Sequence, residues 1–235
     1  MKKDIKRFLN PPKKAKLHEN ITAQLRDLIH TKKLALDDKL PSERELANIL
    51  GVSRVVVRES IQSLEQAGLI EIRTGPTGGA FIVQKLDKPV FLAASDMFKG
   101  GNLTLQHFYE ARKAIETAII RITVEKVKPQ DIDELKTLNN ILLAEIDDKV
   151  SLRKNNRAFH IAIAEIAGNP LLTMMLPAIL ELLDQTYPDP KQPYEFIEKT
   201  HERHNSIIEA LEKKDAVRCD ALMATDTEFT KKIAT

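Results

Sequence analysis

Apolar residues in the second half of the chain recur three and four residues apart, the spacing that places them on one face of an α-helix. This period predicts six helices, over residues 103–127, 131–149, 152–167, 171–186, 194–213 and 215–233. Gly168, Asn169 and Pro170 together form a helix stop signal, and Pro177 should kink the helix that contains it. We therefore expect an antiparallel helical bundle in this half.

The first half of the chain has shorter helical stretches with clear start signals. A first helix is predicted by one apolar stripe, made of Ile21, Leu25, Leu28 and Ile29. Ser42 and Glu45 have the spacing of a capping box, which predicts a second helix that ends near Leu50. Gly51 then makes a turn, and Ser53 is suited to cap the N-terminus of a third helix.

The third helix separates its apolar residues from its arginines. Its buried face is predicted to consist of Val57, Ile61 and Leu64. Arg54 and Arg58 lie one turn apart on another face, with Val55 between them. A short helix, a glycine turn and a longer helix with arginines near its start form the layout of a helix-turn-helix. Residues 69–73 and 80–83 flank a glycine-rich turn and predict a two-stranded wing.

This layout predicts DNA binding through the third helix. Its N-terminus would enter the major groove, where an arginine can pair bidentately with guanine, and Ser53 would help to hold a phosphate. A single arginine on a helix is more often an ordinary solvated charge. The combination of capping box, turn, arginine face and wing favours the DNA-binding interpretation.

Residues 39–83, KLPSERELANILGVSRVVVRESIQSLEQAGLIEIRTGPTGGAFIV, resemble the DNA-binding domain of the GntR family. The resemblance implies a winged helix-turn-helix with DNA contacts from Arg44, Ser53, Arg54, Arg58, Thr74 and Gly75. Val55 and Val56 stand at positions that often touch bases in this family, and valines there can read apolar features such as thymine methyl groups.

Polar residues interrupt the apolar faces of four helices in the bundle. Arg112 occupies a position whose neighbours in the pattern are apolar, and His160, His204 and Asp226 do the same on other helices, with Asn156 one turn before His160. A buried charge without a partner costs several kcal/mol. These groups should therefore meet one another or a ligand.

Two interpretations of these residues remain open at this stage. In one, they form a polar network in which Arg112 pairs with Glu116 one turn further on, while the histidines bond to the backbone. In the other, two histidines and a carboxylate hold a divalent ion such as Zn²⁺, and Arg112 binds the carboxylate of an acid.

The back half resembles the FCD domain, the effector-binding bundle of the FadR subfamily of GntR regulators. The resemblance spans about residues 90–230 and rests on FYEARKAIE at 108–116, NNRAFHIAIAEIAGNP at 155–170 and the segment 204–223. It implies an effector carboxylate on Arg112. It also implies a metal site at the positions of Asn156, His160, His204 and Asp226.

Two of these positions depart from the family pattern. The usual acidic ligand is replaced by Asn156, and the usual last histidine is replaced by Asp226. Because a neutral amide oxygen binds Zn²⁺ weakly, we expect lower affinity or a preference for harder ions. His201 lies near the same face and is an alternative ligand, although the family register favours His204.

Charge and cysteine content narrow the class of protein. Residues 1–85 hold 16 basic and 10 acidic residues, whereas residues 86–235 hold 20 and 24, so the front is the part suited to a polyanion. The single cysteine, Cys219, leaves nothing for an intramolecular disulfide or a CxxC metal site. No apolar run is long enough for a membrane helix, and we expect a cytoplasmic protein.

Together these patterns predict a mostly α-helical regulator with three segments. They are a basic tail over 1–16, a winged helix-turn-helix over 17–84, and an FCD-like bundle of six or seven helices over 85–235. The tail is either disordered or an arm that contacts DNA. We expect a homodimeric repressor that binds an inverted-repeat operator and is released from it by a small organic or fatty acid.

Two other functions compete with this expectation. One is a regulator whose bundle only dimerises and binds no ligand. The other is a metal-dependent hydrolase, built on two histidines and one aspartate that leave a coordination position open. Glu116 and Glu165 are available as a general base, but no HExxH or similar spacing accompanies them, so we do not expect an enzyme.

Overall fold

The computed structural model describes residues 15–144, 149–186 and 194–233, and the chain divides between Pro89 and Val90 into two compact units. Within the described residues, the front unit holds α1 (Ala15–His30), α2 (Glu43–Leu50), α3 (Arg54–Gln66), β1 (Ile70–Arg73) and β2 (Gly79–Ile82). Helix α4 (Asp87–Lys99) begins just before the division. The back unit continues with α5 (Leu105–Lys126), α6 (Pro129–Ala144), α7 (Lys149–Ala167), α8 (Pro170–Thr186), α9 (Tyr194–Glu212) and α10 (Ala216–Ile233).

The start signals of the front unit act as predicted. The backbone N–H of Glu45 donates to the hydroxyl of Ser42 while the Glu45 carboxylate accepts from the Ser42 N–H, which completes the capping box of α2. Gly51 ends this helix in the left-handed conformation, with φ of 64°. The Ser53 hydroxyl then accepts from the N–H of Val56 and caps α3.

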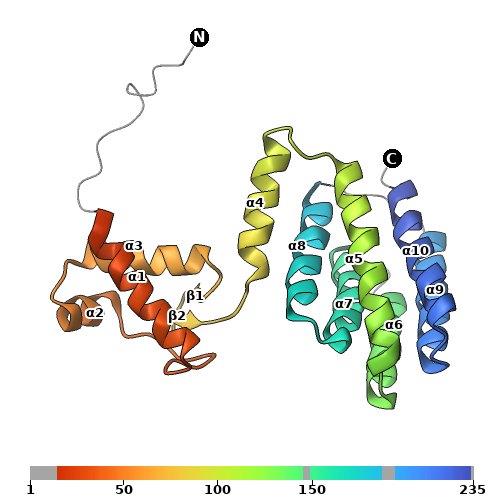
Figure 1. Ribbon diagram of the computed structural model, residues 1–235, viewed down its shortest axis with the longest axis horizontal. Helices are drawn as coiled ribbons and strands as arrows, with labels where there is room; N and C mark the ends of the chain where they lie inside the picture. Colours follow the sequence, from red (N-terminus) through yellow and green to blue (C-terminus); the bar gives the residue numbers. More distant parts are fainter. Residues whose placement is uncertain (1–14, 145–148, 187–193, 234–235) are drawn as a thin grey trace, which may run out of the picture. The chain divides into compact units, whose positions relative to one another are not determined.

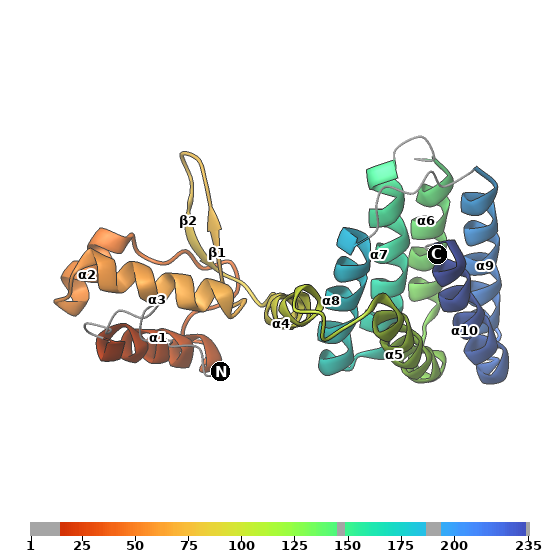
Figure 2. The same ribbon diagram turned by 90° about the horizontal axis from the view of Figure 1, so that it is seen from above.

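The front core lies where α1 packs against α3, and the wing closes one end of it (Figure 1). Buried residues from helices and strands share this core, among them Ile21, Leu25, Leu64, Ile70 and Ile82. Strands β1 and β2 pair antiparallel, with Ile70 opposite Ile82 and Arg73 opposite Gly79. Figure 2 shows the hairpin projecting from the three helices, so its tip is presented to solvent.

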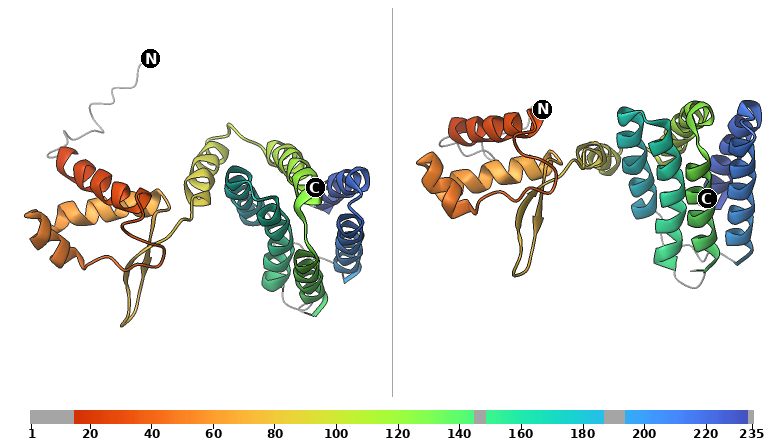
Figure 3. Two further views of the ribbon diagram at one scale, coloured as in Figure 1. Left: turned by 60° about the horizontal axis from the view of Figure 1, so that its bottom comes forward. Right: turned by 90° about the horizontal axis from the view of Figure 1, so that it is seen from below.

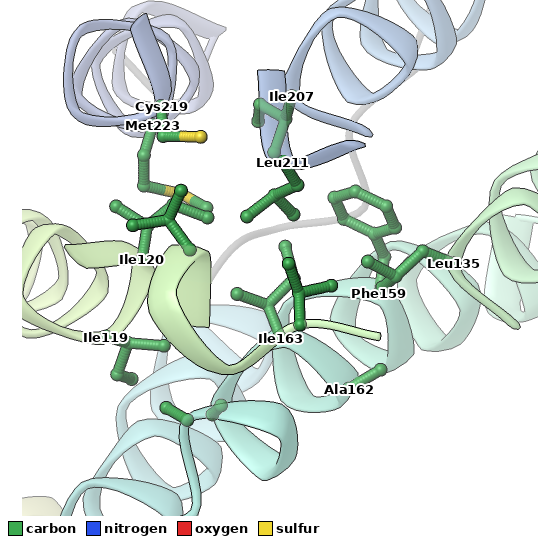
Figure 4. Close-up of a cluster of buried hydrophobic side chains, with 14 of the residues drawn as sticks. Ile119, Ile120, Leu135, Phe159, Ala162, Ile163, Ile207, Leu211, Cys219 and Met223 are labelled. Atoms are coloured by element: carbon green, nitrogen blue, oxygen red, sulfur yellow. The ribbon is translucent and has the colours of Figure 1, made fainter. Parts of the chain in front are cut away.

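In the back unit, α5 packs against α7, α8 and α10, while α6 packs against α7 and α9 (Figure 3). The core between these helices is apolar and includes Ile120, Phe159, Ile163 and Leu211 (Figure 4). The six helices expected from the periodicity are confirmed, with ends that differ by a few residues. Helix α8 continues through Pro177.

Helix α4 is not among the six helices that the periodicity predicts. Pro89 lies in the first turn of α4, where a proline costs no hydrogen bond because that N–H has no partner inside the helix. Phe91, Ala94 and Phe98 then recur at helical spacing and pack with Phe108 of α5. None of the described helices is long and apolar enough to cross a membrane.

Candidate DNA interface and candidate metal centre

The N-terminal half of α3 presents an exposed face to solvent. Arg54, Val55 and Arg58 are all exposed on it, and the Val55 side chain is 62% exposed. Arg44 of α2 is exposed as well. Ser53 is exposed at the cap, beside the N–H groups of the first turn, which carry partial positive charge. This face can therefore offer both base-reading side chains and a phosphate site.

Val56 does not belong to this face, and its predicted base contact is wrong. The residue is 8% exposed and packs in the front core with Leu25 and Leu64. Successive residues on a helix are rotated by about 100°, so Val55 can face solvent while its neighbour faces the core. Only one of the two valines is available to a thymine methyl group.

A carboxylate that the sequence pattern did not indicate lies against the arginines. Glu43 Oε1 accepts from Nε of Arg58 at 2.9 Å, and Glu43 Oε2 accepts from Nη2 of the same arginine at 2.7 Å. Nη2 of Arg54 is 3.8 Å from Oε2. The hydrogen bonds from Arg58 lower the pKa of Glu43, so the carboxylate is ionised at neutral pH.

The wing tip holds the remaining predicted DNA contacts. Thr74 and Gly75 are exposed there, and Gly75 adopts a φ of 106°, which favours glycine. The N–H of Gly78 donates to the carbonyl of Gly75 at 2.9 Å and closes the turn. Lys39 donates to the carbonyl of Thr77 at 3.2 Å and so supports the turn itself.

In the bundle, Arg112 is 2% exposed and lies in a polar cluster. Its Nε donates to Oε1 of Glu116 at 2.8 Å, which is the pairing that the polar-network interpretation predicted. Its Nη2 lies 3.3 Å from Nε2 of His160. Because a guanidinium can only donate, Nε2 of His160 is the acceptor and its proton is on Nδ1, 3.2 Å from the other oxygen of Glu116.

Asp226 joins the same cluster from α10. Its Oδ2 is 3.4 Å from Nε2 of His160, and its Oδ1 accepts from Nε of Arg203 at 2.8 Å. The guanidinium of Arg203 also stacks on the ring of Phe229, with its central carbon 3.7 Å from the ring centroid. Arg203 was not indicated by the sequence, because it lies one residue before His204 and off the apolar face.

His204 completes the cluster and is oriented by Asn139 of α6. The side-chain amide of Asn139 donates to the main-chain carbonyl of His201 at 3.0 Å, which identifies its nitrogen and leaves its oxygen for His204. Nδ1 of His204 lies 3.1 Å from that oxygen and must carry the proton. Nε2 of His204 is then unprotonated and carries a lone pair. This buried atom has no hydrogen-bond partner among the described residues.

Ligand atoms of His160, His204 and Asp226 lie within 4.8 Å of one another, and all three residues are buried. Asn156, the fourth predicted ligand, is half-buried one turn before His160. His201 points elsewhere, with Nε2 3.5 Å from Oδ1 of Asn140. The three candidate ligands are thus part of the polar network, and two imidazoles with one carboxylate suit a divalent ion.

Burial and neighbouring charges set the protonation of the cluster. Burial lowers the pKa of His204 to about 3, so its ring is neutral at physiological pH. Burial alone would raise the pKa of Asp226. The imidazoles of His204 and His160 and the charges of Arg112 and Arg203 outweigh burial and lower this pKa to about 2. The cluster therefore offers a neutral imidazole and an ionised carboxylate, the forms that bind metals.

Comparison with known proteins shows which family the two domains belong to. Residues 107–228 match the FCD domain and residues 17–82 match the gntR family of bacterial regulatory proteins. The two domains define a transcriptional regulator, and not an enzyme. The chain belongs to the GntR family and carries an FCD domain.

Relatives and solved structures cover nearly the whole chain. The HTH-type transcriptional repressor NanR of Citrobacter rodentium is 29% identical, over 92% of this chain and 84% of its own length. The uncharacterised HTH-type regulator YcbG of Bacillus subtilis is also 29% identical, over 92% and 88%. The structure of a Streptococcus agalactiae GntR protein is similar in fold, with a TM-score of 0.66 at 23% identity, covering 92% of this chain and 99% of that one.

The neutral state of His204 predicts an acid-sensitive bundle. The pKa of His204 is about 3 in the folded chain, against an ordinary value of 6.5. As pH falls below 6.5, His204 is therefore protonated in the unfolded chain but stays neutral in the folded chain. The free energy of unfolding should therefore decrease from pH 6.5 to 4.5, a range in which Asp226 stays ionised. Urea unfolding in the presence of a chelator should show this slope. His204→Gln should reduce the slope by up to one proton, and an unchanged slope would contradict the assignment.

Proposed function

We propose that this chain is a homodimeric repressor that reads an inverted-repeat operator and is released by a small carboxylate. The observation that carries the DNA part is the exposed arginine face of α3 beside the projecting wing. In this proposal Arg54, Val55 and Arg58 meet base edges, while Arg44, Ser53, Thr74 and Gly75 contact the backbone or groove edges. Because a bacterial regulator acts on chromosomal DNA, the proposal places the chain in the cytoplasm.

Arg58→Ala should abolish discrimination between operator and random DNA while the protein stays folded. The loss of one bidentate guanine contact is worth about 1–3 kcal/mol of discrimination. The operator can be obtained by selecting duplexes from a randomised pool, and binding measured by fluorescence anisotropy at fixed salt. Arg26→Ala, which removes an exposed charge from α1, is the matched control and should weaken both DNAs alike. Wild-type discrimination by Arg58→Ala would count against this face.

The ligand part of the proposal rests on the charge balance of the buried cluster. Arg112 and Arg203 are balanced by Glu116 and Asp226, and the ring of His204 is neutral. A divalent cation held by His160, His204 and Asp226, with Asn156 as a further oxygen donor, would leave the cluster positive. An anionic effector beside it would offset part of this positive charge, and Arg112 provides a planar fork for its carboxylate. When bound, the metal would supply a Lewis-acidic anchor for that effector.

Metal uptake tests the first half of this proposal. Protein purified without nickel resin and stripped with a chelator should bind about one equivalent of Zn²⁺ or Co²⁺. His204→Gln should abolish the binding, whereas Asn139→Leu should weaken it about 10- to 100-fold because the supporting hydrogen bond is lost. His201→Gln is the control and should bind as the wild type does. Uptake below about a tenth of an equivalent by the wild type would overturn the metal site.

Thermal-shift measurements with small carboxylic acids test the second half. An acid present at about 100 times its Kd should stabilise the wild type by roughly 2.7 kcal/mol. Arg112→Lys should lose this effect, since lysine keeps the charge but not the fork. Arg121→Lys, at a surface pair with Asp220, should keep it.

Other outcomes of this measurement identify the competing functions. If no acid stabilises the wild type, the bundle serves dimerisation alone. If an acid derivative is consumed, the hydrolase is favoured. Stabilisation without turnover supports the sensor, and the acid can act on DNA affinity only by binding one conformer of the dimer better than another.

A further inference from the structure

The pair formed by Glu43 and Arg58 joins the first residue of α2 to the exposed face of α3. Both carboxylate oxygens are used, at 2.9 Å to Nε and 2.7 Å to Nη2. The Arg58 side chain is nevertheless 54% exposed. A parallel two-bond contact of this kind fixes the plane of the guanidinium as well as its position.

The contact occupies only one edge of the guanidinium. An arginine carries five N–H donors in a planar fork, and Glu43 takes the edge formed by Nε and Nη2. The edge formed by Nη1 and the second N–H of Nη2 keeps two parallel donors. Guanine presents O6 and N7 side by side in the major groove, and these two acceptors match two parallel donors.

The same carboxylate bears on contacts with phosphate. Its Oε2 is 3.8 Å from Nη2 of Arg54, so one negative charge lies between the two arginines of the face. DNA binding without sequence preference depends on arginines and lysines that neutralise phosphates. A fixed carboxylate restrains Arg58 from turning to a phosphate and repels that phosphate in addition.

We propose that Glu43 is a specificity-determining positioning residue, which holds Arg58 by one edge so that the other edge reads guanine. The proposal rests on the DNA face proposed above. It differs from a simple brake, in which the carboxylate competes with DNA for Arg58. Removing a brake would strengthen binding to every sequence by the same factor, whereas removing a positioning residue changes the ratio between sequences.

Glu43→Gln separates these cases, because glutamine has nearly the same shape and the capping box uses Ser42 and Glu45 instead. The full-length wild type and variant would each select from a pool of randomised duplexes, and affinities for the selected and a random duplex would be measured. We expect the preference for guanine at the Arg58 position to fall about tenfold and the affinity for random DNA to rise severalfold.

Two further variants make the result specific. Glu59→Gln removes the same charge from the exposed surface of α3, where Glu59 faces His18 at 3.9 Å, and should leave the guanine preference unchanged. In an Arg58→Ala background, Glu43→Gln should cause no further loss of that preference, because the two residues act as one unit.

The outcomes distinguish the role of Glu43 from the proposal that this face of α3 reads DNA. An unchanged guanine preference in Glu43→Gln, with a loss in Arg58→Ala, overturns the role of Glu43 alone. Equal strengthening on all sequences also overturns it and supports the brake. If the wild type selects no sequence, or if Arg58→Ala selects as the wild type does, both the DNA face and the role of Glu43 are overturned.

Discussion

The back unit is organised around charges that cannot be left unpaired in its interior. Arg112, Glu116 and Asp226 are each almost fully buried. Arg112 and Glu116 pair within α5, and all three also lie against residues of other helices. The resulting contacts tie α5 to α7 through His160, and α9 to α10 through the pair of Arg203 and Asp226. Well-packed apolar residues would often be as stable as such a cluster, because burying ions costs several kcal/mol each. This cost is consistent with a cluster that serves binding.

Periodicity in the sequence was sufficient to place the bundle helices and the inward polar residues, since a helix repeats its buried face every three or four positions. It could not indicate Asn139 or Arg203, because their importance depends on which helices become neighbours. The same limit explains why the sequence could not separate exposed Val55 from buried Val56. A run of valines satisfies both a core and a base-reading face, and only packing against α1 decides which residue is buried.

The two units use the same pair of groups in different surroundings. In the front unit, Glu43 holds Arg58 at the surface, where water and salt screen the attraction and the benefit is mainly orientation. In the back unit, Glu116 holds Arg112 where both side chains are buried, so breaking the pair leaves an uncompensated charge. Arg58 is therefore oriented by its carboxylate while it stays open to solvent, whereas Arg112 can release its carboxylate only if another anion or a rearrangement replaces it.

Through the hydrogen bond from Asn139 to the main-chain carbonyl of His201, the protonation of the His204 ring depends on how α6 packs on α9. The carbonyl of His201 and Oδ1 of Asn205, both on α9, hold the amide nitrogen so that its oxygen faces His204, and this depends on how the two helices are aligned along their axes. A shift of about 1.5 Å, one residue of helix rise, would separate the groups and release the imidazole to its other tautomer. Sliding of one helix past another would thus be converted into a change in the basicity of a single nitrogen atom.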